Sequence, residues 1–284
     1  MREYLVDLIL RALIAAARAI PWRARVALMG WITARIIAPY AGYDRRIRAN
    51  LALVWPELPA REVARLVRAV PANAGRTLIE VYSGAEFVDR AAAAPIRGAG
   101  LAALQSARAR GQGAILISGH FGNYDVARAV LGRLGMPVGA LYQPWSNRRF
   151  DVHYRKIIGA ISGPIFPRGR QGLAEMLRHL RAGGFVGILH DQRMEHGAPL
   201  RFFGHTAPTA LSAAEMALRH DLLLVPVYGV RHPDGVGFDL VIEPPIPHTT
   251  PEAMMQAAND SLEAMVRAHP EQWFWVHRRW GAGG

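Results

Sequence analysis

The spacing of hydrophobic and polar positions changes near residue 100. Before that point, apolar residues recur at helical spacing over residues 4–20, 26–40 and 60–87. After it, short continuous apolar runs alternate with segments of helical periodicity. The runs predict strands at residues 113–118, 137–142, 165–166, 185–189, 222–230 and 238–242. The periodic segments predict helices at residues 101–110, 123–135, 148–158, 171–182, 208–220 and 251–269.

This alternation indicates the fold class. Strands that are apolar throughout are covered on both faces, and strands that alternate with helices form mostly parallel sheets. The pattern therefore predicts an α/β fold with a mostly parallel central sheet flanked by helices. Pro71 is expected to break the helical pattern of residues 60–87, and residues 95–100 are expected to form a linker.

The N-terminal stretches have a different character. The charged residues of the first stretch share one sector of roughly 80° on a helical wheel: Glu3, Asp7, Arg11 and Arg18. The second stretch, residues 26–40, carries Arg35 as its only charge. These charges interrupt a signal-peptide pattern, and neither stretch offers about 20 uncharged residues for a membrane span.

Two interpretations of these stretches remain. An amphipathic helical hairpin in a membrane interface fits the pattern, with aromatic anchors: Trp22, Trp31, Tyr40 and Tyr43. Alternatively, both helices pack on the protein's own core. We expect the first arrangement, and therefore a membrane-associating helical segment at residues 1–43 followed by one domain at residues 44–284.

Composition and charge narrow the function classes. The 284 residues include no cysteine, which excludes disulfides, thiolate metal sites and a cysteine nucleophile. The net charge is +12, and Lys156 is the only lysine, so the basic residues are nearly all arginine. Such a surface suits phosphate groups of lipids or cofactors. Nucleic acid is not an expected partner, because the arginines are dispersed and no nucleic-acid-binding motif is present.

The strongest chemical signal lies at residues 118–125, Ser-Gly-His-Phe-Gly-Asn-Tyr-Asp. A predicted strand delivers His120 to a glycine-containing turn, and Asp125 follows as a helix begins. Histidine titrates near neutral pH, and a carboxylate on one ring nitrogen leaves the other free to accept a proton. Because open α/β sheets place their chemistry at strand ends, His120 is predicted to be a general base oriented by Asp125.

Other strand ends carry polar residues. His190, Asp191, Gln192 and Arg193 follow the strand at residues 185–189, and Arg168 and Arg170 follow the strand at residues 165–166. Both arginines are candidates for phosphate recognition. Pro208 and Thr209 are expected to open a helix. No spacing fixes a metal site among His120, Asp125, His190 and Asp191, so no metal is expected. A serine-hydrolase elbow and a P-loop are absent.

The ordered set of motifs resembles the lipid A biosynthesis lauroyl/myristoyl acyltransferases, within the lysophospholipid and glycerolipid acyltransferase superfamily. The matching residues run along nearly the whole chain: Asn50-Leu51, Pro56-Glu57-Leu58, Glu80, residues 120–125, Asp191-Gln192, Phe202-Phe203-Gly204, Ala207, Thr209, Pro226, Pro270-Glu271-Gln272, Trp275, His277, Arg278 and Arg279. The lipid A branch more often has Trp-Glu where this chain has Tyr124-Asp125.

The resemblance implies a bacterial enzyme on the cytoplasmic face of the inner membrane. It would transfer a fatty acyl chain from an acyl carrier protein or coenzyme A thioester to a hydroxyl of a lipid, with no other cofactor. His120 would take the hydroxyl proton and Asp125 would stabilise the imidazolium. Backbone N–H groups of Gly122 and Asn123 would bind the oxyanion. Arg168, Arg170, Asp191, Gln192 and Arg193 would contact substrate.

The acceptor is left open by the sequence. A lipid A precursor is the first expectation, and a lysophospholipid, an ornithine lipid or a glycolipid are alternatives. A non-catalytic, membrane-bound lipid-binding protein would also explain the charge and the N-terminal segment. It would not explain a histidine and an acid at a strand-end turn.

Overall fold

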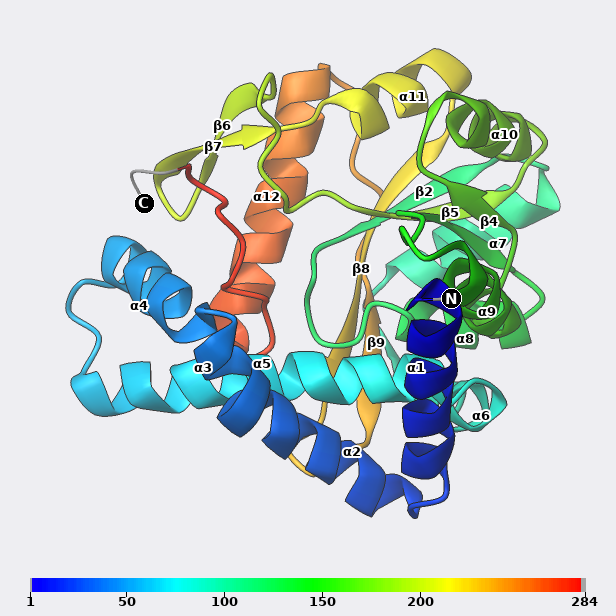
Figure 1. Ribbon diagram of the computed structural model, residues 1–284. Coiled ribbons are helices and arrows are strands. Elements are labelled where there is room, and N and C mark those ends of the chain that lie inside the picture. Colours follow the sequence, from blue (N-terminus) through cyan, green and yellow to red (C-terminus); the bar gives the residue numbers. More distant parts are fainter. Residues whose placement is uncertain (1, 282–284) are drawn as a thin grey trace.

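The computed structural model describes residues 2–281 and has an α/β architecture with helices on both faces of one central sheet (Figure 1). The sheet has the order β1-β9-β8-β2-β5-β3-β4, and every neighbouring pair is parallel except β8 and β9. Its strands are β1 (Ile96–Arg97), β2 (Ala114–Ser118), β3 (Val138–Tyr142), β4 (Ile165–Pro167), β5 (Phe185–Leu189), β8 (Leu223–Arg231) and β9 (Phe238–Ile242). The predicted fold class is confirmed.

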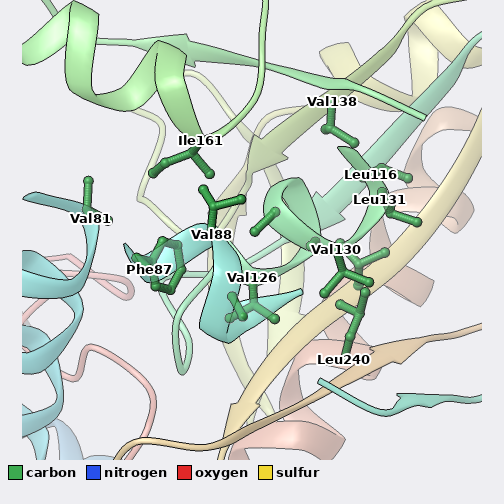
Figure 2. Packing of buried hydrophobic residues seen from close by; sticks show 14 of the residues in the cluster. Val81, Phe87, Val88, Leu116, Val126, Val130, Leu131, Val138, Ile161 and Leu240 are labelled. Carbon is green, nitrogen blue, oxygen red and sulfur yellow. The ribbon is translucent and has the colours of Figure 1, made fainter. Parts of the chain in front are cut away.

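The helices after residue 100 lie close to their predicted positions. They are α7 (Gly100–Ala109), α8 (Val126–Arg133), α9 (Arg148–Ile161), α10 (Arg170–Arg181), α11 (Ser212–His220) and α12 (Pro251–Ala268). The strand β2 is buried at every position, as its unbroken apolar sequence requires. One core cluster lies between α8, β2 and the neighbouring helices. Figure 2 shows Val126, Val130 and Leu131 of α8 within it.

The N-terminal third is helical, as the periodicity predicts. Its elements are α1 (Arg2–Arg18), α2 (Trp22–Ile32), the π-helix η1 (Thr33–Ile37), α3 (Ala38–Tyr40), α4 (Tyr43–Val54), α5 (Ala60–Tyr82) and α6 (Ala85–Ala91). Trp22 and Val26 of α2 are buried in the same core cluster as β2, so the expectation that Trp22 is an interfacial anchor is wrong. The side chain of Glu3 lies outside the described residues. The division at residues 43 and 44 stays a prediction.

Three local predictions are wrong. Pro71 lies inside α5 and does not end it, and residues 95–100 contain the strand β1, which pairs with β9. A proline inside a helix costs about 3 kcal/mol, but α5 packs buried side chains on both sides of Pro71, including Val70 and Ile79. None of the helices within residues 2–281 has both the length and the apolar character that a membrane span requires.

The third wrong prediction is a helix beginning at Pro208. Residues 198–209 instead form an antiparallel hairpin of β6 (Ala198–Phe202) and β7 (His205–Thr209). Its two-residue turn has positive φ at Phe203 and Gly204, which is the geometry of a type I′ turn. A phenylalanine at a positive-φ position and a proline in each strand are unusual for hairpins, so the sequence conceals it. Thr209 therefore caps no helix.

Candidate active site

The sheet register brings two strand ends together. β2 and β5 are parallel neighbours, and Ser118 pairs with Leu189. His120 and Asp191 each lie two residues beyond that pair, at the same edge of the sheet. Because parallel neighbouring strands lie about 4.8 Å apart, side chains at matched positions past their ends can meet.

Asp191 holds the imidazole of His120. His120 Nδ1 lies 2.8 Å from Asp191 Oδ1, and the backbone N–H of His120 donates to Asp191 Oδ2 at 2.8 Å. The indole N–H of Trp273 donates to the same Oδ2 at 2.9 Å. The Asp191 side chain is fully buried, whereas His120 is 25% exposed. The carboxylate is therefore fixed by three donors. Within residues 2–281, His120 Nε2 has no hydrogen-bond partner.

The two groups shift each other's protonation. Burial alone would lower the pKa of His120, but the charge and hydrogen bond of Asp191 outweigh it and raise that pKa above its usual value. Burial would raise the pKa of Asp191, but His120 and then His277 hold it well below its usual range. Asp191 is therefore a carboxylate, and it accepts the Nδ1–H of His120.

A second histidine lies against the pair. The rings of His277 and His120 are 4.6 Å apart between centroids, and His277 Nε2 lies 4.0 Å from Asp191 Oδ2. Burial lowers the pKa of His277 to about 4. His277 is thus neutral at pH 7, and it excludes water from one side of the His120 ring.

The C-terminal segment fixes the turn that carries His120. Phe121 and Trp273 form a β-bridge, and the N–H of Phe274 donates to the His120 carbonyl at 3.0 Å. Gly122 has a φ of 54°, and a Cβ there would lie 1.9 Å from the Gly229 carbonyl oxygen. Only glycine fits this position.

A cavity of about 200 Å³ lies next to His120 and is also lined by Asn73, Thr77, Tyr124 and Trp273. This volume is smaller than that of a typical pocket for a whole small molecule. It suits the reacting ends of larger substrates.

A sequence model of the bacterial lipid A biosynthesis acyltransferases matches residues 1–282. The chain belongs to this family. It is 26% identical to the lipid A biosynthesis lauroyltransferase of Escherichia coli K12 over 240 residues, which cover 82% of this chain and 77% of that protein. It is 27% identical to a phosphatidylinositol mannoside acyltransferase of Mycobacterium tuberculosis over 255 residues, covering 87% and 80%. A Haemophilus influenzae lipid A biosynthesis acyltransferase is 26% identical over 180 residues, 62% of this chain and 56% of that protein.

The chain is therefore an acyltransferase, and the alternative of a non-catalytic lipid-binding protein is set aside. The structure differs from the prediction that Asp125 orients His120. Asp125 Oδ1 lies 2.5 Å from Arg128, whose guanidinium also donates to backbone carbonyls of Ile158 and Ser162. The carboxylate on His120 is Asp191 instead. Asp125 is the residue immediately before α8, and the i to i+3 spacing favours its contact with Arg128.

The predicted oxyanion donors also have other partners. The Gly122 N–H donates to the Gln272 carbonyl at 2.9 Å, and the Asn123 N–H donates to the Gly229 carbonyl at 3.0 Å. The Asn123 amide donates to Glu80 at 2.8 Å. These groups hold the turn in place, so in this conformation neither N–H is available to a reacting carbonyl.

The remaining predicted residues lie farther from His120. Arg168 and Arg170 follow β4, three strands from β2 in the sheet order, and both are exposed. At about 4.8 Å per strand, that separation is roughly 14 Å. Gln192 and Arg193 follow Asp191 directly and are exposed. Contact of these four residues with substrate stays a prediction.

Sequence reasoning missed two residues of this candidate site. Trp273 was not singled out, and His277 appeared only among the residues of the family resemblance, with no role. Both lie in the C-terminal segment, where apolar periodicity gives no signal for them. Among the described residues, ligand atoms of His120, Asp191 and His277 lie within 4.8 Å of one another, an arrangement that could hold a divalent metal. Asp191 already accepts the Nδ1–H of His120 in this arrangement.

Proposed function

We propose that this acyltransferase moves a fatty acyl chain from a thioester to a hydroxyl of a membrane lipid, most specifically a lipid A precursor. The family match and the lauroyltransferase relative support the acceptor class. The donor is an acyl carrier protein or coenzyme A thioester, and no further cofactor takes part. The single observation that carries the mechanism is the hydrogen-bonded pair of His120 and Asp191.

In this mechanism His120 is the general base. Asp191 accepts the Nδ1–H and so fixes the tautomer in which Nε2 is unprotonated. Nε2 takes the proton of the acceptor hydroxyl as its oxygen attacks the thioester carbonyl. The C–O bond forms, the C–S bond breaks, and the proton passes from His120 to the leaving thiolate. With no cysteine in the chain, no thioester forms on the enzyme. We propose that the acyl group passes directly from donor to acceptor.

Tyr124 is proposed as the donor to the oxyanion. It lines the same cavity as His120, the two rings meet edge to face at 5.7 Å, and its hydroxyl has no hydrogen-bond partner among the described residues. Burial raises the pKa of Tyr124, so the phenol stays protonated and able to donate. Replacing Tyr124 by phenylalanine removes this donor. We expect Tyr124→Phe to lower kcat by about a hundredfold with little change in KM, measured by steady-state kinetics. An unchanged kcat would exclude this role.

A different acceptor is the second candidate. The phosphatidylinositol mannoside acyltransferase relative is as similar as the lipid A relatives and aligns over more of the chain. That similarity favours a phosphorylated glycolipid as the common acceptor chemistry. Arg168, Arg170, Gln192 and Arg193 are proposed to contact its phosphates or those of the donor.

Acyl transfer in detergent micelles tests the function. The purified protein would receive acyl carrier protein and coenzyme A thioesters with a lipid A precursor, a phosphatidylinositol mannoside, a lysophospholipid and an ornithine lipid. We expect product with one acceptor class for the wild type and none for His120→Ala. Equal product from both proteins would remove His120 as the base. Absence of product from the wild type with every pair would refute these acceptor classes.

The enzyme is proposed to work at the cytoplasmic face of the inner membrane, bound through residues 1–43. Support comes from apolar side chains that α1 leaves exposed: Tyr4, Leu8 and Leu13. Asp7 is buried instead and lies 3.7 Å from Arg11. Large apolar side chains that a surface helix leaves exposed suit contact with the interface of a bilayer.

Charged residues on this helix should weaken membrane binding. We expect Leu8→Glu/Leu13→Glu to reduce the bound fraction in vesicle flotation at least tenfold, because about 0.8 kcal/mol is lost per CH₂ group withdrawn from the membrane. Glu175→Gln on α10 is the control for an unrelated surface change. Undiminished binding of the double variant would place the membrane contact elsewhere on the protein.

A further inference from the structure

An open groove of about 780 Å³ is lined by residues of α2, η1 and α5. Figure 1 shows α2 beside α5. Five arginines line it: Arg35, Arg61, Arg65, Arg68 and Arg76. Its apolar part consists of Leu28, Trp31 and several alanines. All of these residues lie on helices, so the groove is part of the rigid scaffold.

The groove is separate from the catalytic cavity. At 100° per residue, Arg65, Arg68 and Arg76 lie on one side of α5. Asn73 and Thr77 line the cavity beside His120. They lie on a side of α5 that is rotated about the helix axis by roughly 100–150° from the middle of the arginine side. α5 therefore stands between the two sites, and a ligand in the groove does not occupy the catalytic cavity.

The arginines of the groove carry unbalanced charge. Arg65 pairs with Glu62 at 2.8 Å and Glu271 at 3.6 Å. Within residues 2–281, none of the other four arginines forms an ion pair with an acidic side chain. Burial, and then the nearby charge of Arg231, lower the pKa of Arg76. A bound anion would relieve this concentration of positive charge.

The helix crossing beside the groove is fixed by small residues. Gly75 of α5 contacts Thr33 of η1 so closely that a Cβ would lie 2.2 Å from Thr33 Oγ1. Thr33 donates to the Met29 carbonyl at 2.8 Å within the same helical segment. A π-helical turn of this kind often marks a functional position. The crossing holds the two walls of the groove at a set spacing.

The surface next to the groove is apolar and exposed. Trp31 is 56% exposed and Leu28 is 40% exposed, and Ile36, Ile37 and Tyr40 continue this surface along η1 and α3. Large apolar side chains beside arginines are typical of surfaces that contact a bilayer interface. An acidic protein partner would match the arginines but would leave these side chains in water. The combination therefore favours a lipid.

We propose that this groove binds the phosphate headgroup of an acidic membrane phospholipid, with part of its acyl chain against Leu28 and Trp31. Guanidinium groups bind phosphate oxygens through paired hydrogen bonds. Arg61 and Arg68 lie two turns apart on the same side of α5. The proposal rests on the membrane association in the proposed function. It adds a lipid site that is distinct from the acceptor site.

Vesicle flotation of the full chain tests the site. Vesicles of phosphatidylcholine alone and of phosphatidylcholine with phosphatidylglycerol would be compared for the wild type, Arg61→Ala/Arg68→Ala and Arg178→Ala/Arg181→Ala. The last variant removes the same charge from the exposed surface of α10. Each arginine near an anionic surface contributes about fivefold to binding, so the groove variant should bind phosphatidylglycerol vesicles roughly 25-fold more weakly. The α10 variant should match the wild type.

A second measurement locates the acyl chain. Phosphatidylglycerol with brominated acyl chains quenches tryptophan fluorescence at short range, and Trp31→Phe should remove a measurable part of that quenching. Circular dichroism would confirm that every variant is folded. The expected results are loss of binding only for the groove variant and reduced quenching for Trp31→Phe.

Three outcomes would overturn the proposal, and they separate it from the proposed function. Equal loss in both double variants would mean that net charge alone attracts the protein. Wild-type binding to both vesicle types with no effect of the groove variant would retain membrane association and remove the lipid site. Unchanged vesicle binding together with lost affinity of the groove variant for acyl carrier protein would assign the groove to an acidic protein.

Discussion

Replacing Asp191 by asparagine is expected to lower kcat/KM by roughly 10³- to 10⁴-fold without unfolding the protein. Asp191 accepts both the backbone N–H and Nδ1–H of His120. A neutral amide can keep one of these contacts, but it stabilises no imidazolium and can favour the wrong tautomer. Steady-state kinetics with the acceptor that the micelle assay selects measures the loss, and circular dichroism checks the fold.

The pH dependence distinguishes this role from a structural one. The base must be neutral, so activity is present above the pKa of His120 and is lost as the pH falls through it. Because Asp191 raises the pKa of His120, the acid limb of kcat/KM should lie above the usual histidine value of about 6.5. In Asp191→Asn burial remains without the opposing charge, so the acid limb should move to lower pH.

Asp125→Asn is the matched control, since it makes the same chemical change five residues from His120. Asp125 pairs with Arg128, so its loss should lower stability and leave the position of the acid limb unchanged. A shift of the acid limb in Asp125→Asn but not in Asp191→Asn would return the orienting role to Asp125. Equal activity of Asp191→Asn and the wild type would refute the proposed pair.

The sequence identified the strand ends but not which of their residues meet. His120 and Asp191 both follow apolar runs, and each run predicts a buried strand. Their contact depends on β2 and β5 being neighbours in the matched register, which local periodicity does not specify. The short spacing from His120 to Asp125 favours Asp125 as the partner of His120. The side chain of Asp125 instead pairs with Arg128 of the helix that it precedes.

The residues that hold the site come from still farther along the chain. Trp273 reaches Asp191 across 82 positions, and Asn73 donates to the Gly122 carbonyl across 49. Apolar patterning predicts which residues are buried, but not which distant segments pack together. The hairpin at residues 198–209 is not predicted for a local reason. Its turn has Phe203 at the position before Gly204 where asparagine or aspartate is usual.

A buried ion pair lies beneath the turn that carries His120. Arg231 at the end of β8 donates to both carboxylate oxygens of Glu80 on α5, and both side chains are almost fully buried. Asn123 of the turn donates to Glu80 Oε2 at 2.8 Å. Glu80 thus joins the sheet, α5 and the turn that carries His120.

Glu80→Ala is expected to lower the free energy of unfolding by about 3–5 kcal/mol, because it leaves the charge of Arg231 buried without its partner. Asn123 also loses its acceptor, so kcat/KM should fall at temperatures where the variant is still folded. Urea unfolding measures the first effect, and kinetics measures the second.

Two variants complete this experiment. Asp89→Ala breaks an exposed ion pair with Arg133 and should change stability by less than about 1 kcal/mol. Glu80→Gln keeps an oxygen for Asn123 while removing the charge, so it should lose stability but retain more activity than Glu80→Ala. If Glu80→Ala resembled Asp89→Ala in stability, Arg231 would reach water without Glu80. The ion pair would then have no structural role in holding the catalytic turn.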